Sequence, residues 1–146
     1  MPPKIIENHA NVGIDAGRIV HRILSHVSPD ILTGLNEVRL LERHDQAFAC
    51  YKKNEGVIEI YLGELLRDFH PVFLKLFYPF TYMIVGMALG HELDHHVNRN
   101  SNVMDKEASA ETNIMNYVYP SMGLFKPVVK IVSLCLRPFR RIITKQ

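Results

Sequence analysis

Residues 91–96 read His-Glu-Leu-Asp-His-His, so His91 and His95 are one helical turn apart. On an α-helix this spacing puts both imidazoles on one face, where they can bind a single metal ion. Neutral imidazole is a common Zn²⁺ ligand, and a catalytic zinc keeps three protein ligands and an open fourth position. The spacing therefore predicts that His91 and His95 are zinc ligands.

Glu92 follows the first histidine and lies about 100° further round the helix. Residues 91–95 match H-E-x-x-H, in which the glutamate is the general base of a zinc peptidase. Zinc lowers the pKa of a bound water to about 7, and Glu92 would move the water's proton to the leaving amine. His96 points about 100° away from His95, so we do not expect it to bind metal. We expect Asp94 to be solvated or to cap a neighbouring helix.

A third ligand must come from outside this motif, and the chain turns soon after it. Residues 97–102 are polar and break helices. Asn102 with Asp105 resembles an N-cap with its capping-box acid. We therefore predict a tight turn and a second helix that begins near Val103.

In such an antiparallel hairpin of helices, one register pairs two acidic residues with the two histidines. Glu107 then faces His95, and Glu111 faces His91. We predict that Glu107 is the third metal ligand. Glu111 would accept the other ring N–H of His91 and fix its tautomer, a usual role for a neighbour of a ligand. The alternative for both is an exposed acidic helix face.

The motif H-E-L-D-H, followed by Glu107-Ala-Ser-Ala-Glu111, resembles the gluzincin pattern H-E-x-x-H plus E-x-x-A-D. That pattern occurs in CAAX-prenyl-protease and HtpX-type peptidases and in the small minigluzincins, and ImmA/IrrE-like peptidases carry E-x-x-A-N. The resemblance implies that His91, His95 and Glu107 bind zinc and that Glu92 is the base. Glu111 takes the position of the family's Asp. The chain departs from the pattern there, and its interval between His95 and Glu107 is short for the group.

The chain has the composition of an ordinary globular protein, 47% hydrophobic and 22% charged over 146 residues, and we expect one domain over 1–146. The expected class is α+β, a small zincin-like domain with an N-terminal helix, a three-stranded antiparallel sheet, a zinc helix, a glutamate helix and a C-terminal helix. The patterns put helices at 13–27, 79–98, from about 103 to 119, and 126–143, and strands at 37–43, 47–53 and 57–62. A further helix begins at residues 63–64 and is interrupted at Pro71.

An exposed edge strand beside the zinc would bind an extended peptide by backbone pairing. In the resembling families this strand lies shortly before the zinc helix, so we assign it to 57–62. The alternative is that 57–62 is an interior core strand.

The net charge of +2 does not call for a nucleic-acid partner. Cys50 and Cys135 have no motif spacing and indicate free thiols in a reducing compartment. The N-terminus lacks a signal-peptide pattern, so we expect a cytoplasmic protein.

Two apolar stretches bear on a membrane. The stretch 76–90 is shorter than the about 18–20 residues of a membrane span and contains Pro79, which favours a buried core helix. The basic C-terminal stretch could contact an anionic membrane, although a solvated helix face is the favoured interpretation. The oligomeric state is not indicated.

The oxyanion of a tetrahedral intermediate needs a donor besides the metal. Tyr82, Tyr117, Tyr119 and His70 are candidates, but each residue type more often packs or lies at the surface. We assign none of them.

These patterns favour a zinc-dependent endopeptidase whose substrate is a peptide or protein. A peptide deformylase-like amidohydrolase is the closest rival, with Cys50 as a ligand about forty residues upstream. However, Ala-Phe-Ala-Cys-Tyr differs from the Gly-Cys-Leu-Ser type and leaves Glu107 and Glu111 without a role. A latent or non-catalytic metal-binding interaction protein is the third reading, which closed four-ligand coordination would favour.

Overall fold

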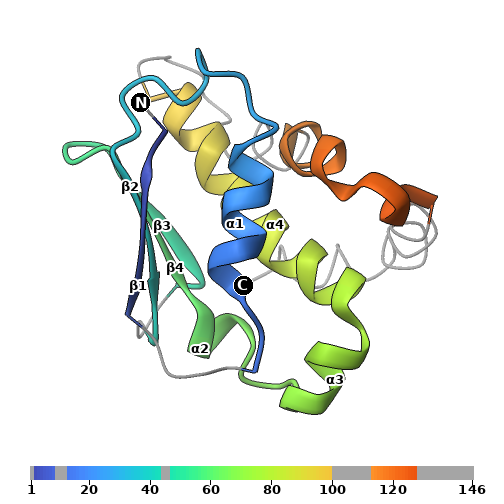
Figure 1. Ribbon diagram of the computed structural model, residues 1–146. Coiled ribbons are helices and arrows are strands. Elements are labelled where there is room, and N and C mark those ends of the chain that lie inside the picture. Colours follow the sequence, from blue (N-terminus) through green and yellow to red (C-terminus); the bar gives the residue numbers. More distant parts are fainter. Residues whose placement is uncertain (1, 9–12, 44–46, 100–112, 128–146) are drawn as a thin grey trace.

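The computed structural model describes residues 2–8, 13–43, 47–99 and 113–127 (Figure 1). They form an α+β fold, as predicted, in which α1 and α4 pack together on one face of a mixed sheet (Figure 1). The strands are β1 (Lys4–Asn8), β2 (Glu37–Leu41), β3 (Ala49–Lys52) and β4 (Val57–Tyr61). The helices are α1 (Ala16–Leu24), α2 (Leu62–Leu65), α3 (Pro71–Leu76), α4 (Tyr78–Val97) and the 3₁₀ helix η1 (Tyr119–Phe125), and residues 113–118 are also helical.

The sheet has four strands in the order β1-β2-β4-β3. β1, β2 and β4 are parallel, and only β3 is antiparallel to its neighbour β4. The predicted three-stranded antiparallel sheet is therefore wrong in strand number and in direction. The physical reason is that α1 connects β1 to β2, and a helical connection returns the chain to the same end of the sheet, as parallel pairing requires.

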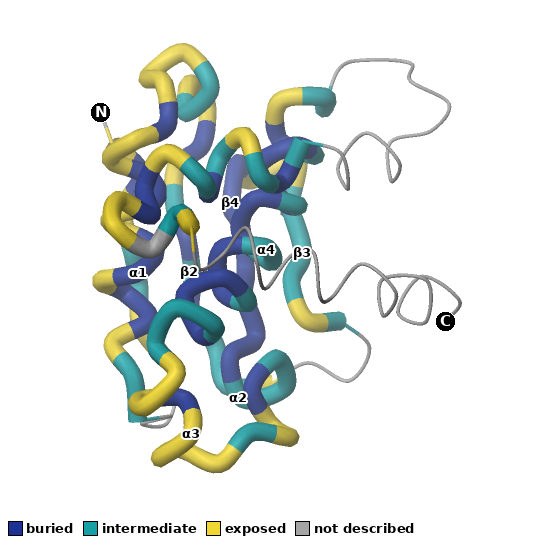
Figure 2. The backbone as a smooth tube through the Cα atoms, turned by 90° about the vertical axis from the view of Figure 1, so that its right-hand side faces the viewer, coloured by how far each residue is buried: buried dark blue, intermediate teal, exposed yellow. Residues whose placement is uncertain are grey.

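The predicted edge strand is also wrong. β4 lies between β2 and β3 and is buried along its whole length, so 57–62 contains an interior strand (Figure 2). β3 is half-buried and is the edge strand that contacts α4. β3 is an edge of the described sheet and contacts α4, so the backbone of β3 borders the candidate site.

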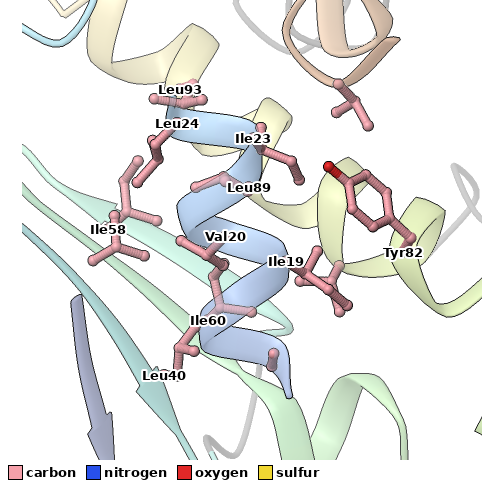
Figure 3. Close-up of a cluster of buried hydrophobic side chains, with 14 of the residues drawn as sticks. Ile19, Val20, Ile23, Leu24, Leu40, Ile58, Ile60, Tyr82, Leu89 and Leu93 are labelled. Carbon is pink, nitrogen blue, oxygen red and sulfur yellow. The ribbon is translucent and has the colours of Figure 1, made fainter. Parts of the chain in front are cut away.

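The core lies between the sheet and the two central helices. Asp15 caps α1 by accepting a hydrogen bond from the backbone N–H of Arg18 at 2.8 Å, which confirms a helix within 13–27. The apolar stripe of α1 faces side chains of β2, β4 and α4 (Figure 3). The labelled members of this cluster are Ile19, Val20, Ile23, Leu24, Leu40, Ile58, Ile60, Tyr82, Leu89 and Leu93.

Helix α4 confirms the helix predicted over 79–98. Its apolar half is buried, and two glycines let the 113–118 helix approach closely. A Cβ at Gly86 would lie 2.7 Å from Cγ1 of Val118, and one at Gly90 would lie 3.0 Å from the carbonyl oxygen of Ile114. Within the described ranges, no helix combines the length and apolar character needed to cross a membrane.

The other predicted helices are described in part. The helix expected from residues 63–64 is divided into α2 and α3, and Pro71 begins α3 in the first turn, where proline is tolerated. The α-helical residues 113–118 end before Pro120, as predicted, although the chain continues as the 3₁₀ helix η1. Most of the predicted helix 126–143 lies outside the described residues.

Candidate metal centre

The two histidines of the motif come together on one face of α4. Their Nε2 atoms are 3.0 Å apart, and their rings are edge to face with centroids 4.6 Å apart and an angle of 86° between planes. Two imidazole nitrogens bound to one tetrahedral zinc at about 2.1 Å lie about 3.4 Å from each other. The side chains of His91 and His95 therefore fit a shared zinc ion with little adjustment.

The described residues supply no third ligand beside His91 and His95. Among the described residues, no three side chains of His, Cys, Asp or Glu lie close enough together to hold a metal ion. Glu107 and Glu111 lie in 100–112, outside the described residues. Their roles as third ligand and as partner of His91 therefore stay predictions.

A cavity of about 440 Å³ opens between β3 and the last turns of α4. The motif residues His91, Glu92 and His95 line one side of it, and residues in and just after β3 line the other. The described residues that line it are Ala49, Cys50, Tyr51, Lys53, His91, Glu92, His95 and Arg99. Glu92 is only 6% exposed, so its carboxylate reaches this cavity from a buried position.

Cys50 lies between two acidic side chains in this cavity wall. Burial raises the pKa of its thiol, and the nearby carboxylates of Glu92 and Glu59 raise it further. Metals bind the thiolate rather than the neutral thiol. In the absence of a metal ion the surroundings of Cys50 therefore favour the neutral thiol, whereas a bound zinc ion would itself favour the thiolate.

His96 is fully buried and is not among the residues that line the cavity. Its Nε2 lies 3.2 Å from the carbonyl oxygen of Thr33, and its Nδ1 lies 2.9 Å from the hydroxyl of Tyr51. Burial lowers the pKa of His96, and the charge of Arg99 lowers it further. Arg99 Nη1 lies 2.9 Å from the same Nε2 atom. His96 therefore ties α4 to the edge strand β3.

Asp94 is 1% exposed, so the prediction that it is solvated is wrong. It accepts hydrogen bonds from Asn98 Nδ2 at 2.8 Å, Asn113 Nδ2 at 3.0 Å and the Tyr117 hydroxyl at 3.4 Å. Burial and the Asp94 carboxylate together raise the pKa of Tyr117 to about 12. The packing of 113–118 against α4 covers Asp94, and this could not be read from the residues around the motif.

The aromatic residues considered as oxyanion donors have other contacts. Tyr117 donates to Asp94, and the Tyr82 hydroxyl donates to Ser121 Oγ at 2.7 Å. His70 caps α3 by accepting from the N–H of Val72, and Lys126 Nζ lies 5.4 Å from the centre of the Tyr119 ring. None of these four side chains lines the described cavity.

Sequence reasoning missed four cavity residues, of which Tyr51, Lys53 and Arg99 have polar groups and the fourth is Ala49. Arg99 had a usable signal, because His91, His95 and Arg99 follow one another at four-residue spacing on one helix face. No sequence pattern indicated Tyr51 and Lys53, because their position beside α4 depends on the order of the strands in the sheet.

Comparisons of this chain with protein-family models, with curated proteins and with solved structures found no match.

Proposed function

We propose that the protein is a small zincin-like, zinc-dependent endopeptidase. In this proposal His91, His95 and Glu107 bind zinc, Glu92 is the general base, and Glu111 orients His91. The observation that carries it is the 3.0 Å approach of the two histidine Nε2 atoms at a cavity that Glu92 also lines. A helix alone would bring two such histidines together, but the adjoining cavity gives a substrate access to them.

Zinc, when bound, supplies Lewis-acid activation of the attacking water and of the substrate carbonyl. Glu92 follows His91 directly and is buried at the cavity wall, where its carboxylate can accept the proton of the attacking water. The same carboxyl group then returns the proton to the amine that leaves. The low exposure of Glu92 keeps competing solvent away from this transfer.

The edge strand β3 supports a peptide as the substrate. β3 pairs with β4 on one side, and no strand of the described residues pairs with its other side. An extended peptide can add to such an edge through backbone hydrogen bonds. Because Cys50 and Tyr51 of β3 line the cavity with the motif residues, a peptide on this edge passes close to Glu92.

Two other functions remain as alternatives. Cys50 lines the cavity, which is the observation that favours a deformylase-like amidohydrolase, but that function gives Glu107 and Glu111 no role. A latent or non-catalytic metal-binding protein would need a fourth protein ligand in place of an open position. The free thiol of Cys50 fits our expectation of a reducing, cytoplasmic location.

The experiment that tests the proposal measures zinc content and cleavage of casein and peptides. We expect about one zinc per chain in the wild type, and a loss of at least about 100-fold in turnover for Glu92→Ala with zinc retained. Glu107→Ala should lose zinc. If Glu92→Ala keeps full activity, the mechanism is wrong, and if Glu107→Ala binds zinc as tightly as the wild type, Glu107 is not a ligand.

Two adjacent histidines provide a matched control for the zinc site. His95→Gln removes a proposed ligand, whereas His96→Gln removes the buried link to Tyr51 and Thr33. We expect His95→Gln to weaken zinc binding far more than His96→Gln, measured by competition with a chromophoric chelator. Equal losses in the two variants would mean that the effect comes from damage to α4 and not from lost coordination.

A further inference from the structure

We propose that the cavity selects substrates with an acidic side chain about three residues from the scissile bond, bound by Lys53 and Arg99. This inference rests on the proposed peptidase function and adds the class of substrate. Both cations line the same cavity as Glu92, and neither belongs to the motif.

The two cations lie together at one end of the cavity because β3 and α4 run in the same direction along it. Cys50 and Glu92 line the same cavity on opposite sides, and the hydroxyl of the next residue, Tyr51, lies 2.9 Å from His96 Nδ1. Further along the chain, Lys53 lines the cavity just after β3, and Arg99 lines it just after α4. The three residues from Cys50 to Lys53 span about 10 Å in a strand. The seven residues from Glu92 to Arg99 also span about 10 Å in a helix.

This distance sets the position of the selected residue. An extended peptide that pairs with β3 advances by about 3.3 Å per residue, so 10 Å corresponds to about three residues. A peptide bond at Glu92 therefore brings a side chain about three positions away to the level of Lys53 and Arg99. Antiparallel pairing is slightly favoured and would put that side chain on the amino-terminal side of the scissile bond.

The charges of Lys53 and Arg99 are available to a ligand. The guanidinium of Arg99 is held by the carbonyl oxygen of Thr33, 3.3 Å from both Nη atoms, and its Nη1 also lies 2.9 Å from Nε2 of His96. Among the described residues, no carboxylate lies within ion-pair distance of Arg99 or Lys53. The neighbouring Lys52 differs, because its Nζ lies 2.8 Å from Glu59. The cavity thus presents two cations that the described part of the chain does not neutralise.

The experiment compares peptides that carry Asp or Asn at each of four positions on either side of the scissile bond. We expect kcat/KM to favour Asp by about fivefold near the third position, the size typical of partly exposed ion pairs. The preference should shrink at about 0.5 M salt, because screening shortens the range of such pairs. Equal rates for Asp and Asn peptides at every position would overturn the inference while leaving the peptidase function intact.

Charge reversal makes the test specific. Lys53→Glu should remove the Asp preference and favour a Lys-containing peptide at the same position, a gain that misfolding does not produce. Lys75→Glu is the matched control, because it makes the same charge change on α3, away from the cavity. We expect Lys75→Glu to keep the Asp preference of the wild type. Loss of that preference in both variants would attribute it to net charge and would overturn the assignment.

Binding separates this inference from the proposed function. Fluorescence anisotropy measures the affinity of labelled Asp and Asn peptides in a protein that carries Glu92→Gln, without any turnover. We expect the Asp peptide to bind about fivefold more tightly, and Lys53→Glu to abolish the difference. If no peptide is cleaved by the wild type but this difference is present, the acidic-peptide site stands and the peptidase proposal fails. If both peptides bind equally at low salt, the acidic-peptide site is wrong.

Discussion

Glu59 on β4 and Glu92 on α4 are both buried carboxylates, 5% and 6% exposed, and both lie near Cys50. Their partners differ. Glu59 accepts a hydrogen bond from the Tyr61 hydroxyl at 2.6 Å and pairs with Lys52 at 2.8 Å and Arg39 at 3.4 Å. Glu92 instead lines the cavity beside the two motif histidines.

The comparison teaches that burial alone does not identify a carboxylate that does chemistry. Burial raises the pKa of Glu59, but its hydrogen bonds to Lys52, Tyr61 and Arg39 together lower the pKa below the ordinary value. A carboxylate stabilised in its charged form by three fixed donors is a weak proton acceptor. The role that we propose for Glu92 therefore rests on its cavity and its neighbours, whereas Glu59 bonds to residues of the sheet strands.

The largest effect should separate the two glutamates by activity. Glu92→Gln keeps the shape but removes the proposed base, so we expect at least about a 100-fold loss of kcat for peptide cleavage. Glu59→Gln should keep kcat within about threefold, because Glu59 does not line the cavity. Steady-state kinetics on zinc-loaded proteins measure both. Equal losses would mean that the two carboxylates act as one unit and would break the comparison.

The second effect is on stability. Glu59→Ala leaves the buried end of Tyr61 and the ammonium of Lys52 without their acceptor, so we expect a loss of about 2 kcal/mol in the free energy of unfolding. Glu55→Ala is the matched control, because Glu55 also faces Arg39, at 3.5 Å, but its side chain is 53% exposed. We expect less than about 0.5 kcal/mol there. Urea denaturation followed by circular dichroism measures the difference, and similar losses in the two variants would contradict it.

The third effect is a pH dependence that belongs to Glu59. Folding lowers the Glu59 pKa below its ordinary value of 4.5, so the folded protein binds fewer protons than the unfolded chain near that pH. The resulting stabilisation is present above that pH and is lost as the pH falls through the folded-state pKa. Between about pH 6 and pH 3.5 the wild type should lose more stability than Glu59→Gln. Parallel losses in the two proteins would show that Glu59 is not the source.

The smallest effect concerns Cys50, which lies between the two carboxylates. We expect Cys50→Ser to bind zinc as tightly as the wild type, because the proposed ligands are His91, His95 and Glu107 and do not include Cys50. Burial and both glutamates raise the pKa of the Cys50 thiol. The native thiol should also react slowly with iodoacetamide near pH 8, and faster in Glu59→Gln, where one negative charge is gone. Zinc titration and mass spectrometry measure these outcomes. Loss of zinc in Cys50→Ser would instead support the deformylase-like alternative.

The elements that were predicted correctly are those whose signal is local. The apolar stripe of α1, capped by Asp15, and the long apolar run of α4 are readable from short windows. The same holds for the four-residue spacing of His91 and His95. Strand β1 was missed because its residues, Lys-Ile-Ile-Glu-Asn, do not alternate between apolar and polar, so they lack the usual pattern of a strand.

The pairing of strands and the buried polar contacts were not readable in this way. The alternation of apolar and polar residues in 57–62 predicts a strand. The interior position of this strand in the sheet depends on its pairing with β2, about twenty residues earlier in the chain. Likewise Asp94 is buried by Asn113 and Tyr117, and His96 by Thr33 and Tyr51. Each contact joins segments far apart in the chain.

The sequence by itself determined the helix that carries the motif and the common face of His91 and His95, because a helix fixes these through local geometry. Only the tertiary structure decided which strand borders that face, and hence that Cys50, Tyr51, Lys53 and Arg99 share the cavity with Glu92. The physical reason is that strand order is set by the burial of whole faces of the sheet, and no short stretch of residues encodes it.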